Sequence, residues 1–371
     1  MVVFSSPLEV DPQMRCNRIA GWLLAAVMPA LAGDRVIPQT ADQLLEAGHY
    51  KQARTLAEAD LRKNPKDSHA LYLLSRTRLA MGDSDGALDF AKKAVTAAGN
   101  NPEYLAQLGN AAGDKAQNAG WFEKLRLASL VKDSGSKALQ LDPNNLHANQ
   151  LMFEFYWKAP GIAGGDKDKA REIVNTILRL DPVEGNLYLA EMALLEKKND
   201  QVESYYAKAV SAGAKNYKAR IALASFYAGG KDDQSSKAEK EAREAVNIDR
   251  QRAGAYAVLA LLYAKQKRWA ELDAALAEAE KNVPDNLNPM YQAGRILLGE
   301  GSDLPRAEKY FRKYLTQEPE GGSPHLAAAH WRLGLVLEKM GRKPEAKAEI
   351  ETAVRLKPDF KPAQEDLRRL K

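Results

Sequence analysis

The feature that most constrains the fold of this chain is a period of about 34 residues that runs along it. Residues typical of helix ends recur at Pro65, Gly99, Pro143, Pro182, Asn216, Arg250, Pro284, Pro319 and Pro358. The intervals between them are 34, 44, 39, 34, 34, 34, 35 and 39 residues. A period of this length is typical of arrays whose units are pairs of helices.

Small or apolar residues occupy the positions twelve and five residues before most of these helix ends. The pairs are Ala87 and Ala94, Ala170 and Ile177, Ala238 and Ala245, Leu272 and Ala279, Ala307 and Tyr314, and Ala346 and Ala353. Two residues seven apart lie on one face of a helix, two turns from each other. Small side chains there allow a neighbouring helix to approach closely, so we expect these positions to be packed against the next helix.

Each period divides into two helices joined by a turn. The segments 81–83 and 340–342 place Gly82 and Gly341 where a left-handed helix cap is needed. Apolar residues recur every three or four positions, which excludes strands. One pair of helices is too small to fold alone, whereas stacked pairs share a continuous core. We therefore expect an all-α fold.

The pattern resembles the tetratricopeptide repeat over about residues 34–360, as about nine units. The last unit carries the resemblance most clearly, through His330, Leu333, Gly334, Leu337, Gly341, Ala346, Ala353 and Pro358. The resemblance implies a right-handed α-solenoid whose first helices line a concave groove. We assign residues 33–361 to this solenoid and residues 362–371 to a capping helix. The repeat register within 183–250 is left open.

The N-terminal residues 1–32 have the pattern of a signal peptide. Arg15 and Arg18 precede the apolar run 19–28, and small residues follow Pro29. The apolar run is shorter than the roughly 20 residues that a spanning helix needs. The interpretation is export to a bacterial periplasm with no stable membrane span after cleavage. The alternative is an inner-membrane anchor formed by residues 19–32.

Two further observations concern this end of the chain. Residues 1–13 fit no region of a signal peptide, so either Met1 or Met14 is the true start. The single cysteine, Cys16, lies inside the candidate signal peptide. A mature chain would then have no cysteine, which excludes disulfides and thiol chemistry in it.

Charge argues against nucleic acid as a partner. The 54 basic residues are interleaved with 49 acidic ones, and the net charge is +5. Nucleic-acid binding needs Lys and Arg concentrated in one patch or stripe. The sequence contains no such block.

No motif for catalysis, a metal or a cofactor is found. The sequence lacks a phosphate-binding P-loop and a nucleophile elbow, and none of its five histidines has the spacing of a zinc protease. Asp166 and Asp168 lack the rest of a calcium loop, so helix capping is the better interpretation. We expect a protein that is not an enzyme.

Two irregular segments interrupt the period, near residues 113–123 and 159–168. The first contains Trp121 and Phe122, and the second contains Pro160, Gly161, Gly164 and Gly165. Irregular segments of a repeat array often form functional loops. The interpretations are a binding loop at the edge of the groove or a tolerated insertion. The second segment also resembles a loop of exported bacterial tetratricopeptide proteins of unknown role.

The resemblance also assigns candidate groove residues, at fixed positions of each first helix. They are His69, Tyr72, Arg76, Asn110, His147, Gln150, Glu154, Trp157, Tyr291, Arg295 and Trp331. Aromatic and Arg side chains of this kind are enriched at protein-binding hot spots, although some of the aromatic residues would pack between repeats instead. A subset of the family binds a partner's C-terminal carboxylate through Lys and Asn. This chain has Tyr72 and Arg76, or Tyr291 and Arg295, at the matching positions, which argues against that role.

The sequence thus favours a non-catalytic scaffold of the bacterial cell envelope that binds a protein or peptide in the groove. One alternative is a carbohydrate- or peptidoglycan-binding protein. The other is an enzyme whose site lies in the irregular segments.

Overall fold

The computed structural model describes residues 40–230, 232–322 and 324–370, and these residues form 19 α-helices and two short 3-10 helices. The candidate signal peptide, residues 1–32, lies outside the described residues. The helices are α1 (Ala41–Ala47), α2 (Tyr50–Lys63), α3 (Ser68–Ala80), α4 (Ser84–Ala97), α5 (Pro102–Gln117), α6 (Trp121–Leu141), α7 (Leu146–Lys158), η1 (Gly161–Ala163), α8 (Lys167–Leu180), α9 (Pro182–Leu195), α10 (Asn199–Ala212), α11 (Tyr217–Gly229), η2 (Asp232–Gln234), α12 (Ser235–Ile248), α13 (Ala253–Lys265), α14 (Trp269–Asn282), α15 (Asn288–Glu300), α16 (Leu304–Tyr314), α17 (Leu326–Lys339), α18 (Lys343–Leu356) and α19 (Lys361–Arg369).

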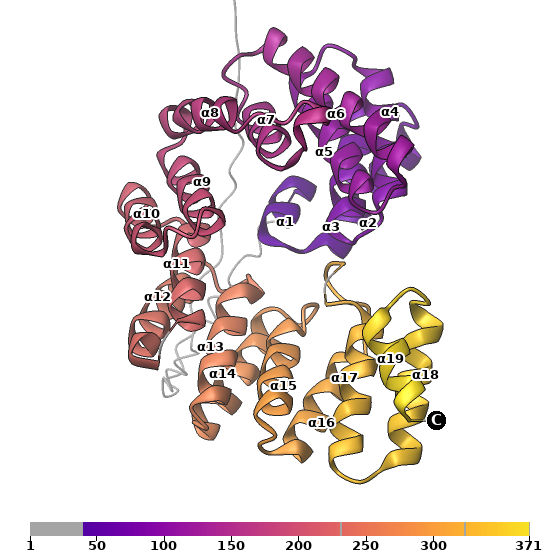
Figure 1. The fold of residues 1–371 in the computed structure, drawn as a ribbon, viewed down its shortest axis with the longest axis vertical. Coiled ribbons are helices and arrows are strands. Elements are labelled where there is room, and N and C mark those ends of the chain that lie inside the picture. Colours follow the sequence, from indigo (N-terminus) through magenta and orange to yellow (C-terminus); the bar gives the residue numbers. More distant parts are fainter. Residues whose placement is uncertain (1–39, 231, 323, 371) are drawn as a thin grey trace, which may run out of the picture. The chain divides into compact units, whose positions relative to one another are not determined.

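Consecutive helices pack as nine pairs, α1 with α2 through α17 with α18, and α19 packs on the last pair (Figure 1). The predicted all-α array of about nine helix pairs is confirmed. The uncertain register in 183–250 resolves into two regular pairs, α9 with α10 and α11 with α12. Each pair also contacts the next one, which is how a repeat array obtains its shared core.

Short polar side chains begin many of the first helices. Asp67, Asn101, Asn145, Asp181 and Asn216 each accept hydrogen bonds from backbone N–H groups in the first turn of the helix that follows. Such caps satisfy donors that have no partner inside the helix. They fix where each repeat starts.

The turn inside most pairs contains a left-handed residue. Gly82 and Gly341 adopt φ of 81°, which confirms the expected glycine caps. The equivalent positions of two other pairs hold Lys197 at φ 60° and Lys267 at φ 57°. A side chain with a Cβ is strained there.

The predicted small-residue stripe is buried throughout. All twelve residues are at most 4% exposed, and Ala87, Ala170 and Ala346 have no exposed surface. The largest cluster of buried apolar side chains runs from Tyr217 in α11 to Ala346 in α18. Smaller clusters stabilise the pairs before α11.

Candidate functional site

The predicted groove residues lie on the first helices of their pairs. His69, Tyr72 and Arg76 are on α3, Asn110 is on α5, His147, Gln150, Glu154 and Trp157 are on α7, Tyr291 and Arg295 are on α15, and Trp331 is on α17. They do not form one cluster. Ten of them fall in three regions with different chemistry, and Asn110 lies half-buried on α5 outside these regions.

The first region joins α3 to α1 through charged pairs. The His69 Nε2 atom lies 2.9 Å from Asp42, and Arg76 donates to the Glu46 carboxylate at 2.6 Å. The Tyr72 ring is 7% exposed and contacts the Tyr104 ring at 5.1 Å between centroids. Burial raises the pKa of Tyr72. This region is therefore partly neutralised by its own carboxylates.

The second region, on α7 and α9, is rich in carboxylates. Gln150 donates to Glu184 at 3.2 Å, and Lys218 reaches the same carboxylate at 2.7 Å. Burial and the nearby Glu154 raise the pKa of Glu191. His147 pairs with Glu103, and this hydrogen bond lowers the pKa of Glu103.

Trp157 is buried near the end of α7, as Tyr72 and Tyr291 are buried on their own helices. It is 8% exposed and stacks on Phe153 at 6.0 Å between ring centroids. Lys167 and Arg171 of α8 place their cations over its ring. The cause is its position near the end of α7, where the next helix covers it. Trp157 belongs to a buried cluster that α7 forms with α8 and α9.

The third region lies on α15 and α17. Tyr291 is 4% exposed and packs on Tyr314 at 5.0 Å. Trp331 donates from Nε1 to Asp366 of α19 at 2.7 Å. Sequence reasoning missed Arg332, whose guanidinium lies over the rings of both Tyr291 and Trp331. The only signal in the sequence for Arg332 was that it directly follows the predicted groove residue Trp331.

The first irregular segment is mostly helical and not a loop. Its extra residues lengthen α5 and α6, leaving 118–120 between them. Trp121 is 56% exposed and Phe122 is 87% exposed at the start of α6. These are two of the large apolar side chains that the described surface exposes.

The second irregular segment is a tight turn around η1. Gly164 adopts φ of 96° beside the Phe155 ring, and a Cβ on Gly165 would lie 1.8 Å from the carbonyl oxygen of Ala159. Pro160 and Gly161 begin the 3-10 helix, whose Ile162 is 78% exposed. Gly164 and Gly165 therefore serve the backbone geometry of this turn.

A contact between distant repeats was not predicted at all. The first two pairs meet the loops that follow α14 and α16. His49 lies 3.0 Å from the Asp285 carboxylate, and Lys51 donates from Nζ to the carbonyl oxygens of Asp285 and Glu318. Gly322 donates to the carbonyl oxygen of Ala80 at 2.8 Å. We call this set of contacts the closure.

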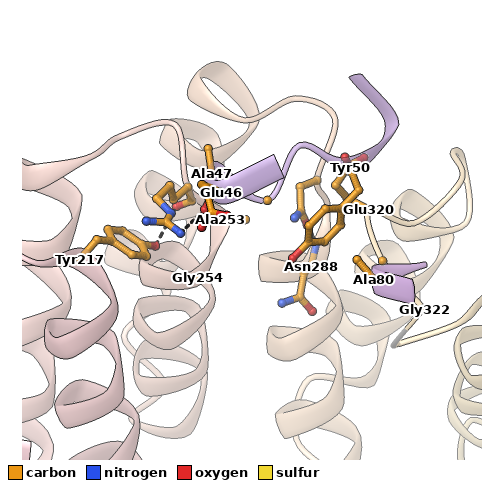
Figure 2. Close-up of a pocket in the computed structure, with 14 residues that line it drawn as sticks. Glu46, Ala47, Tyr50, Ala80, Tyr217, Ala253, Gly254, Asn288, Glu320 and Gly322 are labelled. Carbon is orange, nitrogen blue, oxygen red and sulfur yellow. Dashed lines mark hydrogen bonds between the residues drawn. The ribbon is translucent and has the colours of Figure 1, made fainter. Parts of the chain in front are cut away.

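A pocket of about 440 Å³ lies at the closure (Figure 2). Tyr217 and Glu46 stand at one side of it, and Tyr50, Asn288 and Glu320 stand at the other. Arg252 stacks on Tyr217 at 4.4 Å and donates to the backbone of Glu46. The full lining is Glu46, Ala47, Gly48, Tyr50, Ala80, Tyr217, Arg252, Ala253, Gly254, Asn286, Asn288, Glu320, Gly321 and Gly322. The pocket is polar and exists because the closure brings these elements together.

The family comparisons agree with this repeat architecture. Residues 44–109 and residues 327–360 each match a model described as a tetratricopeptide repeat. The chain contains tetratricopeptide repeats. The matched segments include α2–α4 and α17–α18, and no curated protein sequence matches the chain.

Solved structures of other tetratricopeptide repeat proteins are similar to this chain. TTC0263 of Thermus thermophilus is 27% identical, covering 50% of this chain and 94% of its own, with a TM-score of 0.45. Yeast Tom70 is 14% identical, covering 89% and 86%, with a TM-score of 0.48. Cut9, in its APC/C complex with Hcn1, is 14% identical, covering 89% and 76%, with a TM-score of 0.44.

No helix in the described segments is both long enough and apolar enough to cross a membrane. Across the same segments, no three His, Cys, Asp or Glu side chains converge in a metal-binding arrangement.

Proposed function

We propose that this tetratricopeptide repeat protein is a non-catalytic scaffold that binds a protein partner on the surface of its first helices. The repeat itself carries the proposal, because arrays of this kind present extended surfaces for recognition. Polar groups of several first helices remain accessible. His69 is exposed, and Asn110 and Gln150 are half-buried.

A photo-crosslinking amino acid tests which surface binds the partner. It replaces His69, Asn110 or Gln150 on first helices, and matched variants carry it at Lys92, Glu172 or Lys240, which are exposed on second helices. We expect protein adducts from the first set. Adducts mainly from the second set would place the partner on the outer helices. A complete lack of protein adducts from either set would contradict the scaffold.

We also propose that the scaffold works in the bacterial cell envelope. The support is the basic, apolar and small-residue order of residues 14–32. N-terminal sequencing of the protein purified from its own cells tests this location. Cleavage after Ala32 is expected. An intact residue 19–32 segment in a membrane fraction would favour the anchor, and an intact chain in the cytoplasm would contradict export.

A further inference from the structure

A line of hydrogen-bonded polar side chains follows α15. Gln292 donates from Nε2 to the Asn288 Oδ1 atom at 3.1 Å, and Arg295 donates from Nε to the Gln292 Oε1 atom at 3.0 Å. Figure 2 shows Asn288 at the edge of the closure pocket, where this line begins. The line fixes the orientation of the Arg295 guanidinium through Nε, and within 40–230, 232–322 and 324–370 no hydrogen bond is made by its two terminal nitrogens.

A second guanidinium comes from the neighbouring first helix. Arg332 of α17 lies 5.5 Å from the ring centroid of Tyr291 and 4.7 Å from that of Trp331. Both rings are themselves fixed, Tyr291 by the Tyr314 ring and Trp331 by its hydrogen bond to Asp366. Stacking of this kind orients a guanidinium and leaves its edge free to donate.

These two arginines differ from many others in their charge pairing. Arg268, Arg306 and Arg342 each reach at least two carboxylates within ion-pair distance. Over residues 40–230, 232–322 and 324–370, neither Arg295 nor Arg332 has a carboxylate within 4.0 Å. Both are half-buried. Burial and the like charge of Arg295 lower the pKa of Arg332. Two partly desolvated cations without a counter-ion are a favourable place for an anion.

We propose that Arg295 and Arg332 bind side-chain carboxylates of an acidic segment in the protein partner. This inference rests on the proposed scaffold function and assigns the chemistry of one part of its surface. A guanidinium donates two parallel hydrogen bonds to a carboxylate, and the rings of Tyr291 and Trp331 exclude water from one side. The carboxylates of Glu154, Glu184 and Glu191 on α7 and α9 would repel a long polyanion, so a short acidic segment fits better than a nucleic acid.

Gln292 is the positioning residue of this site, because it holds Arg295 by the Nε atom. Gln292→Glu would place a carboxylate of this chain beside Arg295, where it would compete with the carboxylates of the partner. The substitution keeps the shape of the side chain and changes its charge. A loss of binding in this variant would therefore report charge recognition and not a structural role of Gln292.

The test is fluorescence anisotropy of a short labelled poly-glutamate peptide with the full chain. We expect binding that weakens as salt is added. Arg295→Gln, Arg332→Gln and Gln292→Glu should each weaken it by about tenfold or more, the change that corresponds to about 1.4 kcal/mol. Arg355→Gln is the matched control, because Arg355 is exposed on α18 and bonds only Thr352 among the described side chains. Its binding should be unchanged.

Four outcomes would overturn the assignment. They are absence of peptide binding, equal losses in the Arg355→Gln control, unchanged binding in all three site variants, and equally strong competition by inorganic phosphate and acetate. Melting curves identify any variant that has lost its fold. If Arg332→Gln is one of them, Arg332→Lys replaces it as the milder substitution, and we expect it to retain part of the binding. If the peptide fails to bind while crosslinks from His69 or Gln150 still capture a protein, the acidic-segment assignment is wrong and the scaffold function stands.

Discussion

The Lys51 ammonium group lies 3.1 Å from a carboxylate oxygen of Glu320, a side chain with no exposed surface. The backbone N–H of Lys51 donates to the other oxygen of that carboxylate at 2.7 Å, across 269 positions of sequence. Burial raises the pKa of Glu320, and the bonds from Lys51 oppose that rise. This pair holds the first helix pair against the loop after α16.

Removing the ammonium group should open the closure. Lys51→Met leaves the Glu320 carboxylate buried without its counter-charge, and loss of one partner of a buried pair costs about 3 kcal/mol or more. We expect faster amide exchange in the peptides that contain residues 285–286 and 317–322, with little change in α5–α8. Hydrogen exchange followed by mass spectrometry measures both regions in one experiment.

Two controls accompany this variant. Lys63→Met removes a pair with Asp60 whose side chains are 76% and 53% exposed, and such pairs contribute less than about 1 kcal/mol. Lys51→Met combined with Glu320→Gln should recover part of the lost protection, because no buried charge remains. Equal exchange in Lys51→Met and the native chain would contradict a closed array.

The closure should also depend on pH through His49. The hydrogen bond to Asp285 raises the pKa of His49 against the opposing effect of burial. Burial would raise the pKa of Asp285, but its bonds from His49 and Gln52 outweigh that and lower it. The His49 contribution is therefore present below pH 6.5 and lost as pH rises through the raised pKa. The Asp285 contribution is present above pH 3.8 and lost as pH falls through the lowered pKa.

We expect the urea midpoint of the native chain to exceed that of His49→Gln most between pH 3.8 and 6.5. The difference should shrink as the solution becomes alkaline. His69→Gln removes the pair with Asp42, whose side chains are 51% and 48% exposed, and should change the midpoint less. A difference that grows towards alkaline pH would be inconsistent with a protonated His49.

Two helical glycines should respond to alanine in opposite directions. A Cβ on Gly185 of α9 would lie 2.2 Å from the Cα atom of Leu178 in α8, whereas a Cβ on Gly299 of α15 meets nothing within 4 Å. Gly185→Ala should destabilise the chain by about 1–3 kcal/mol through overpacking against backbone. Gly299→Ala should stabilise α15 by up to about 1 kcal/mol. Melting temperatures of the two variants measure the contrast, and equal shifts would contradict the packing of α8 on α9.

The turn between α13 and α14 should be improved by glycine. Lys267 holds φ of 57° there. Lys267→Gly removes the steric strain of this conformation but makes the unfolded chain more flexible, so we expect the free energy of unfolding to rise by up to about 1 kcal/mol. Gly341→Ala is the reverse experiment at φ of 81°, and a Cβ there meets nothing within 4 Å, so its expected loss comes from the backbone alone. Thermal unfolding measures both, and a loss in Lys267→Gly would refute strain at this turn.

The helical array could be predicted from the sequence because its determinants are local. Ala346 and Ala353 lie two turns apart on one helix, and that spacing is enough to indicate the buried face. Glycines at the turns add a second local signal. The same pattern recurs in most units, so the helix pairs could be counted before their arrangement was known.

The candidate site could be predicted less well, for two physical reasons. Periodicity places Trp157 on the expected face of α7 but does not reveal that α8 covers it. The pairing of Lys51 with Glu320 depends on the curvature summed over many repeats, and no local pattern encodes that sum. Arg332 was missed because its role comes from the Tyr291 ring of another helix and from the lack of a carboxylate beside it in the part of the chain that the structure describes.

The closure changes which end of the array is able to fray. In an open array each terminal unit has one neighbour, so unfolding starts at both ends at similar cost. Here α2 has a neighbour on each side, α3 in sequence and the loops at Asp285 and Glu320 in space. Local unfolding should therefore begin at α19 and move toward the N-terminal repeats, so that the repeats unfold in a defined order.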